Sequence, residues 1–265
     1  MTSAPQGALT TRRRRVPALV IVAIACAWLL VVVAQVTGQA KNLHHGALIE
    51  GGLSLVVALG LFLLAWQVMI AAMMLPSSLP LFRLFATVSA GAPHPRATFA
   101  AFLAGYVMVW TGFGALAFLG DIAVHHAVDA SPWLSAHSWL IGAGVLALAG
   151  LFQFTPLKDR CLSKCRHPSA YLLPRYRRGI RSAFALGGGH GLFCLGCCWA
   201  LMLVMFATGV ANLIWMGALT ALMVYEKTGS AGRRVVPLAG VVLLCGAALV
   251  LALSPWLPEA AMSTN

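Results

Sequence analysis

The feature that most constrains this chain is a succession of long apolar runs, separated by short segments that hold nearly all of its charged residues. Across the 265 residues, 60% are hydrophobic and only 9% are charged, whereas about 25% of a typical soluble domain is charged. A soluble core could not bury so much apolar surface, but a lipid bilayer accommodates helices that are apolar all round. We therefore expect an all-α, polytopic bundle of transmembrane helices.

Seven runs approach the length of about 20 apolar residues that a helix needs to cross a bilayer. They lie at about residues 16–36, 53–75, 97–119, 137–154, 184–206, 209–225 and 235–253. We expect Pro76 and Pro80 to end the second helix, since proline lacks the donor that an interior turn needs. The runs form one transmembrane domain, 16–254, which follows a basic tail (1–15), includes a basic loop (155–183) and precedes a short outer tail (255–265).

The basic residues give the orientation. If the seven runs cross alternately, seventeen of the eighteen lysines and arginines lie on one side, and only Lys41 lies on the other. Positive residues concentrate on the cytoplasmic side of membrane proteins. This predicts a multi-pass protein of the bacterial cytoplasmic (inner) membrane, with the N-terminus inside and the C-terminus outside. The same distribution leaves no single basic face for nucleic acid, despite a net charge of +12.

The densest group of reactive side chains lies in the fifth run. His190, Cys194 and Cys198 follow one another at intervals of four residues, and Cys197 and Met202 lie on the same side of a helix. Imidazole and thiolate groups are ligands for zinc or Cu(I), and thioethers favour Cu(I). The alternative is a glycine-rich contact, in which small residues let two helices approach closely. The two interpretations are compatible.

A second group lies in the basic loop. Cys161 and Cys165 have the separation of paired zinc cysteines, and His167 follows them. We expect the basic neighbours to lower the pKa of both thiols and favour thiolate. These neighbours are Lys158, Arg160, Lys164 and Arg166. The alternative is a short amphipathic segment held on anionic lipid.

A third group is a methionine stripe in the second run, where Met69 and Met73 share one helix face and Met74 follows. Such stripes are more often ordinary packing than ligands. The predicted orientation nevertheless places this stripe in the cytoplasmic half, with the fifth-run group and the basic loop. We therefore expect Met69 or Met73 within reach of His190 or Cys194.

Glu226 and Lys227 end the sixth run on the same side. We expect a solvated pair at the membrane interface. The alternative is that Glu226 orients His190 through a hydrogen bond, as groups around a metal ligand commonly do.

Four sequence blocks together resemble a known family. They are Trp66-x2-Met69-x3-Met73-Met74-x-Pro76, Phe152-Gln153-Phe154-Thr155-Pro156-Leu157-Lys158-x2-Cys161-x3-Cys165-Arg166, His190-Gly191-x2-Cys194-x-Gly196-Cys197-Cys198-Trp199-x2-Met202, and Trp215-Met216 with Glu226-Lys227. In this order, over about residues 55–230, they are similar to an uncharacterised bacterial family of predicted metal-binding integral membrane proteins (domain of unknown function 2182). The resemblance implies that these residues form the signature of that family and that they bind a metal.

The preferred hypothesis is a membrane protein that binds, and transports or otherwise handles, Cu(I) or zinc in its cytoplasmic half. The candidate ligands are His190, Cys194, Cys197, Cys198, Cys161, Cys165, Met69, Met73 and Met202, with His167 and Glu226 as additions. A transition metal ion and the lipid bilayer are the expected partners. The first alternative is a membrane thiol–disulfide oxidoreductase, because Cys194 and Cys197 form a Cys-x-x-Cys motif.

The second alternative is an assembly subunit without chemistry, whose cysteines only pack. The chain contains no P-loop, no dinucleotide fingerprint and no arrangement typical of serine hydrolases. No nucleotide cofactor is expected, and an enzymatic role is disfavoured without being decided.

Overall fold

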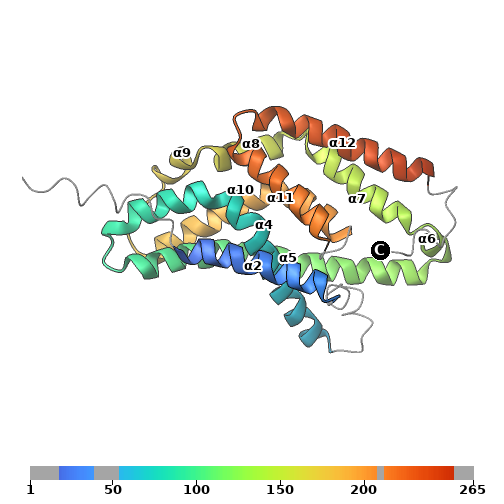
Figure 1. The fold of residues 1–265 in the computed structure, drawn as a ribbon, viewed down its shortest axis with the longest axis horizontal. Helices are drawn as coiled ribbons and strands as arrows, with labels where there is room; N and C mark the ends of the chain where they lie inside the picture. The colour runs from blue at the N-terminus through green and yellow to red at the C-terminus, as the bar shows by residue number, and fades with distance from the viewer. Residues whose placement is uncertain (1–17, 39–53, 208–211, 254–265) are drawn as a thin grey trace, which may run out of the picture.

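The computed structural model describes residues 18–38, 54–207 and 212–253, and within these ranges it contains helices and no strand (Figure 1). The expected all-helical fold is confirmed. The elements are α2 (Ala18–Val36), α4 (Leu55–Val88), the 3-10 turn η3 (Ser89–Gly91), α5 (Pro95–Ala130), α6 (Pro132–Ala136), α7 (Trp139–Phe152), α8 (Pro156–Arg166), α9 (Pro168–Leu172), α10 (Ile180–Ala207), α11 (Leu213–Thr228) and α12 (Gly232–Leu253). The predicted tails 1–15 and 255–265, and the segment around Lys41, lie outside the described residues.

Five of the described helices are long and apolar enough to cross a membrane, namely α2, α4, α5, α10 and α12. A sixth crossing is possible if α7 and α8, which meet at a bend of 66°, together form one span. This is compatible with a membrane protein. The seven crossings and the orientation remain predictions, since α7 has only 14 residues and α11 only 16.

The expectation that proline ends the second helix is wrong, because α4 continues through Pro76 and Pro80 to Val88. Pro76 has no N–H to offer the carbonyl of Ala72, four residues before it. The indole Nε1 of Trp28, on α2, donates to this carbonyl at 3.0 Å instead. The Ser77 hydroxyl donates to the Met74 carbonyl at 2.9 Å. A substitute donor such as the Trp28 indole lets an apolar helix retain proline.

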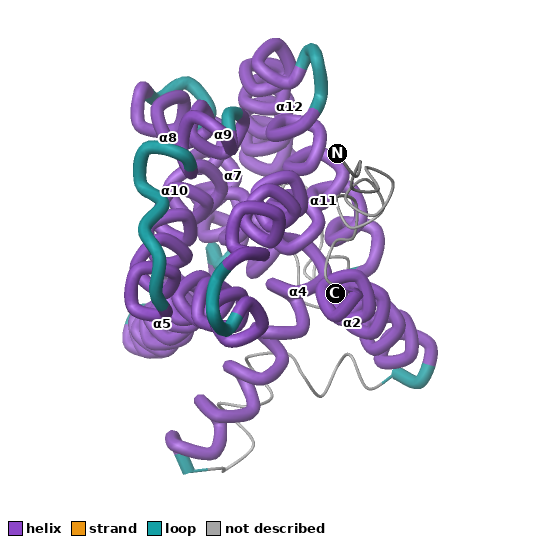
Figure 2. Tube along the Cα trace, turned by 90° about the vertical axis from the view of Figure 1, so that its left-hand side faces the viewer, coloured by secondary structure: helices purple, strands orange, loops and turns teal. Residues whose placement is uncertain are grey.

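Glycines bring α10 against α5. A Cβ at Gly187 would run into the Phe102 carbonyl, and a Cβ at Gly105 would run into the Phe184 carbonyl. Figure 2 shows the two helices side by side. The glycine-rich helix contact considered from the sequence is therefore present, and it positions the reactive groups of α10 rather than replacing them.

The segment predicted as a basic loop contains two short helices. Thr155 begins α8 by accepting a hydrogen bond from the Lys158 amide at 3.3 Å, and Pro156 occupies the first turn. Helix α8 packs on α10 and α11, and Figure 2 shows it above α10. A Cβ at Gly196 would lie 2.6 Å from the Cys161 Sγ, so glycine lets the two helices meet at this sulfur.

Candidate metal centre

Four cysteines from two helices form one thiol cluster, which we define as Cys165, Cys194, Cys197 and Cys198. The last three lie on α10 and are at most 1% exposed, while Cys165 comes from α8 and is partly buried. Hydrogen bonds link the Cys165 thiol to Cys197, and the Cys198 thiol to both Cys194 and Cys197. The helical period of the fifth run thus places its thiols together, as the sequence predicts.

Helix α4 meets this cluster through Met74 and Ser78. The Cys198 Sγ lies 3.7 Å from the Met74 Sδ, and the Ser78 Oγ lies 3.9 Å from the Cys194 Sγ. The second and fifth runs do converge, but the thioether in contact is Met74, which the sequence analysis left out of its ligand set. Met69 and Met73 are buried on the same helix.

A lysine and a tyrosine contact the Cys194 thiol. The Lys227 Nζ donates to the Cys194 Sγ at 3.2 Å and to the Ser77 Oγ at 2.9 Å. The Tyr106 hydroxyl lies 3.2 Å from the same sulfur. Lys227 is 4% exposed, and a cation this deep requires polar or negative partners.

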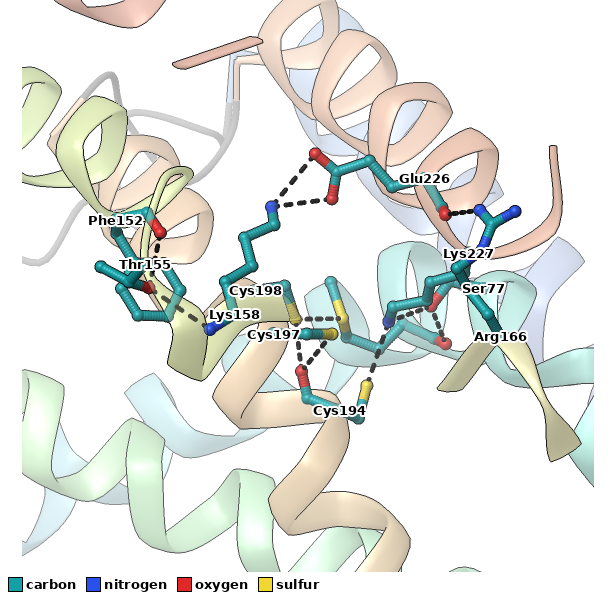
Figure 3. Close-up of polar contacts among 11 residues, drawn as sticks. Ser77, Phe152, Thr155, Lys158, Arg166, Cys194, Cys197, Cys198, Glu226 and Lys227 are labelled. Carbon is teal, nitrogen blue, oxygen red and sulfur yellow. Dashed lines mark hydrogen bonds and ion pairs between the residues drawn. The ribbon is translucent and has the colours of Figure 1, made fainter. Parts of the chain in front are cut away.

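The expectation of a solvated Glu226–Lys227 pair is wrong. The Glu226 carboxylate is 2% exposed and accepts two hydrogen bonds, at 2.8 and 3.1 Å, from the Lys158 ammonium, which is fully buried. Arg166 of the same helix α8 donates to the backbone carbonyls of Glu226 and Gly229. These contacts fasten α8 to the end of α11, on one side of the thiol cluster (Figure 3).

The basic neighbours do not lower the pKa of the α8 thiols, contrary to expectation. Burial raises the pKa of Cys161, and a hydrogen bond to Cys197, together with burial, raises that of Cys165. Lys158 is paired with Glu226, and Arg166 faces backbone carbonyls, so neither cation is directed at these sulfurs. We conclude that both thiols are protonated in the metal-free protein.

His190 lies beside the cluster rather than in it. Its Nε2 is 3.3 Å from the Ser78 Oγ, and its ring stacks on Tyr106 with the centroids 5.6 Å apart. The Nδ1 atom is buried without a hydrogen-bond partner. Tyr171 also packs on this ring, and burial raises the pKa of Tyr171 to about 12, which keeps its hydroxyl a donor to the Leu186 carbonyl. Glu226 is held by Lys158, so no contact supports its role as an orienting group for His190.

The remaining candidates are dispersed. His167 is exposed at the junction of α8 and α9, whereas Met202 is fully buried one turn beyond Cys198 on α10. Sequence reasoning missed Ser77, Ser78 and Tyr106 as neighbours of the thiols. A serine pair directly after Pro76 in an apolar run was an available signal, because polar groups there need a partner.

In the described part of the chain, no group of three or more His, Cys, Asp or Glu side chains is arranged to hold a metal ion. A soft metal would therefore need a mixed set of thiols and thioether. The 3.7 Å between the Cys198 and Met74 sulfurs suits such a set. Two sulfurs on one tetrahedral metal, each at about 2.3 Å, lie roughly 3.8 Å apart. Thiol and thioether donors together select Cu(I).

The chain is an all-helical protein with buried thiol and thioether groups that suit a soft metal. Comparison with known proteins gives its family. Residues 63–250 match the family model PpoB2, described as copper chaperone. Because the match covers most of the chain, the protein belongs to the PpoB2 family. No curated protein and no solved structure matches it. This copper-related family is compatible with the expected metal-handling family, and the assignment to domain of unknown function 2182 stays a prediction.

Proposed function

We propose that this protein binds Cu(I) within a membrane-embedded helical bundle and passes it on, as the description of its family suggests. Cys197, Cys198 and Met74 hold the ion, and Cys194 stands beside them with Lys227 as its counter-charge. The proposal keeps the seven crossings, the cytoplasmic N-terminus, the bacterial inner membrane and the single transmembrane domain as expected from the sequence. It also keeps the family of uncharacterised metal-binding membrane proteins as the finer classification.

The observation that carries this proposal is the joint burial of Cys198 and Met74 at a sulfur–sulfur distance of 3.7 Å. Two further thiols, Cys194 and Cys197, contact Cys198. A thioether does not bind hard cations well, so its place beside thiols favours Cu(I) over zinc.

Helix α8 supplies the entry to this site. Cys165 links it to the cluster through Cys197, and Cys161 packs on Gly196 of α10. Both thiols lie within the basic segment 155–183, which the distribution of lysines and arginines assigns to the cytoplasmic side. Copper arriving there would exchange from the α8 thiols to those of α10, shedding thiol protons as each sulfur takes the metal.

The experiment is a copper and thiol analysis of protein purified in detergent under reducing conditions and loaded with Cu(I). We expect each protein molecule to retain at least about one copper ion after desalting. Once a chelator removes the copper, we expect all seven cysteines to be free thiols. Protein that retains no copper contradicts the proposal.

One contact favours a second function, thiol–disulfide exchange. The Cys197 thiol donates to the Cys194 carbonyl at 3.1 Å and contacts Cys165, so Cys165 and Cys197 form the better-placed redox pair. Oxidising this pair to a disulfide would release two electrons and two protons, and a partner disulfide would take them up and become two thiols. Finding this disulfide in copper-free protein purified without a reductant would support this function in place of the first.

A further inference from the structure

The packing of α10 on α4 follows a regular antiparallel register. The His190 ring lies 6.4 Å from the Phe82 ring, the Cys194 sulfur lies beside Ser78, and the Cys198 sulfur lies beside Met74. Each step of four residues forward on α10 is thus a step of four residues backward on α4. The next step pairs Met202 with the region of Ile70, between Met69 and Met73.

The face of α10 that carries the thiols continues as methionine. Met202 and Met205 follow Cys198 at four and seven residues, the spacing that keeps side chains on one helix face. Both are fully buried. They extend the row of sulfur atoms away from α8.

Two other helices present methionine toward the same region. On α11, Met223 and Met216 precede Lys227 by four and eleven residues. On α4, Met73 and Met69 precede Ser77 by four and eight residues. Lys227 and Ser77 are themselves hydrogen-bonded and α4 packs on α11, so Met223 and Met73 each lie about one helical turn from this contact.

All six of these methionines are at most 2% exposed. We define the methionine column as Met69, Met73, Met202, Met205, Met216 and Met223. From Cys194 to Met205 the rise along α10 is about 16 Å, close to half of the roughly 30 Å hydrocarbon thickness of a bilayer.

We propose that the methionine column is a second Cu(I)-binding segment, which continues the thiol cluster toward the opposite face of the bundle. This inference rests on the proposed function, since the cluster is where copper would enter the column. Thioethers carry no charge, so they bind Cu(I) more weakly than thiolates and let it leave again. Each transfer breaks one copper–sulfur bond and forms another; copper remains Cu(I), no electron moves, and a thiolate left behind regains its proton.

Selenomethionine makes this proposal directly measurable, because selenium marks thioether ligands in the copper X-ray absorption spectrum. We would load selenomethionine-labelled Met74→Leu protein with two equivalents of Cu(I). This variant removes the methionine whose sulfur lies 3.7 Å from the Cys198 sulfur. The expected result is a copper–selenium contribution from the column, alongside copper–sulfur contributions from the thiols.

A second variant adds Met73→Leu, Met202→Leu and Met223→Leu, substitutions that conserve volume and are usually tolerated in a core. We expect it to lose the copper–selenium contribution and at least half of the second equivalent of copper, while the thiol-bound equivalent shows that the protein is folded. Met108→Leu, at a position 55% exposed on α5, is the matched control and should change nothing.

The outcomes separate the two proposals. Copper–sulfur contributions without any copper–selenium contribution in the Met74→Leu protein would overturn the column and leave the thiol site standing. Protein that binds no copper at all would overturn both. An unchanged spectrum in the four-fold variant would also overturn the column, because copper would then have other ligands.

Discussion

The ammonium of Lys227 lies 3.2 Å from the sulfur of Cys194, where Cys194 is fully buried and Lys227 is only 4% exposed. The Glu226 carboxylate is already paired with Lys158, so it does not serve as the counter-ion of Lys227. Among the described residues, the buried charged side chains are therefore two lysines and one carboxylate. A negatively charged copper–thiolate centre would balance the second cation, which is costly to bury alone.

This charge balance predicts that Lys227 supports copper binding without ligating copper. Lys227→Gln should weaken Cu(I) binding by about 10- to 100-fold, the range typical of groups that support metal ligands. Competition with a coloured Cu(I) chelator measures the affinity. Arg234→Gln, at an exposed position on α12, is the control for loss of one positive charge. Equal affinities for the Lys227→Gln and wild-type proteins would show that the ammonium serves packing alone.

The buried pair of Lys158 and Glu226 predicts a strongly non-additive effect on stability. Lys158→Met alone should destabilise the protein by about 3–5 kcal/mol, since it leaves a buried carboxylate uncompensated. Adding Glu226→Gln should recover much of this loss. Unfolding in detergent measures both, and additive losses would contradict a direct pair. Removing the exposed ion pair through Asp159→Asn should cost at most about 1 kcal/mol.

Much of the site follows from helical periodicity, and the rest depends on contacts between distant segments. The four-residue spacing of His190, Cys194 and Cys198 predicts a common helix face, which the structure shows. The partner of Glu226 could not be predicted, because Lys158 lies 68 residues away and the fold alone brings the two together. Glu226 and Lys227 were expected at the interface because charged residues at the ends of apolar runs usually are solvated there.

The second helix shows a different reason for failure. Proline usually ends helices because a carbonyl is left without its donor, and the sequence near Pro76 gives no sign of a replacement. That donor is Trp28, from another helix. The same continuation of α4 places Ser78 beside the Cys194 sulfur, one turn after Met74, which lies beside the Cys198 sulfur. Local rules thus predicted which helices carry the site, and tertiary contacts determined which of their residues form it.

The Trp28 contact predicts a coupling between an indole and a proline. Trp28→Phe should destabilise the protein by about 1–3 kcal/mol, because the Ala72 carbonyl loses its donor. In a Pro76→Ala background the restored backbone N–H can serve that carbonyl, so the same change should cost less than about 1 kcal/mol. A double-mutant cycle from unfolding in detergent gives the coupling. Identical costs in the two backgrounds would contradict the assigned donor.

The close approach of α5 and α10 predicts a contrast between two glycines. Gly187→Ala should destabilise the protein by about 2 kcal/mol or more, since its Cβ meets the backbone of Phe102, which cannot move aside easily. Gly112→Ala on α5 meets no atom within 4 Å, so it should be neutral or stabilise by up to about 1 kcal/mol. Thermal unfolding of the two variants tests this, and a tolerated Gly187→Ala would exclude such close packing.

The thiol cluster as a copper site is tested most directly by the Cu(I) affinities of matched cysteine variants. Cys197→Ser and Cys198→Ser remove proposed ligands, while Cys26→Ser and Cys245→Ser change exposed cysteines outside the cluster. In chelator competition we expect the first two to weaken Cu(I) binding at least 10- to 100-fold, and the last two to match the wild type. Equal Cu(I) affinity in all four variants and the wild type would show that copper, if bound, is held elsewhere.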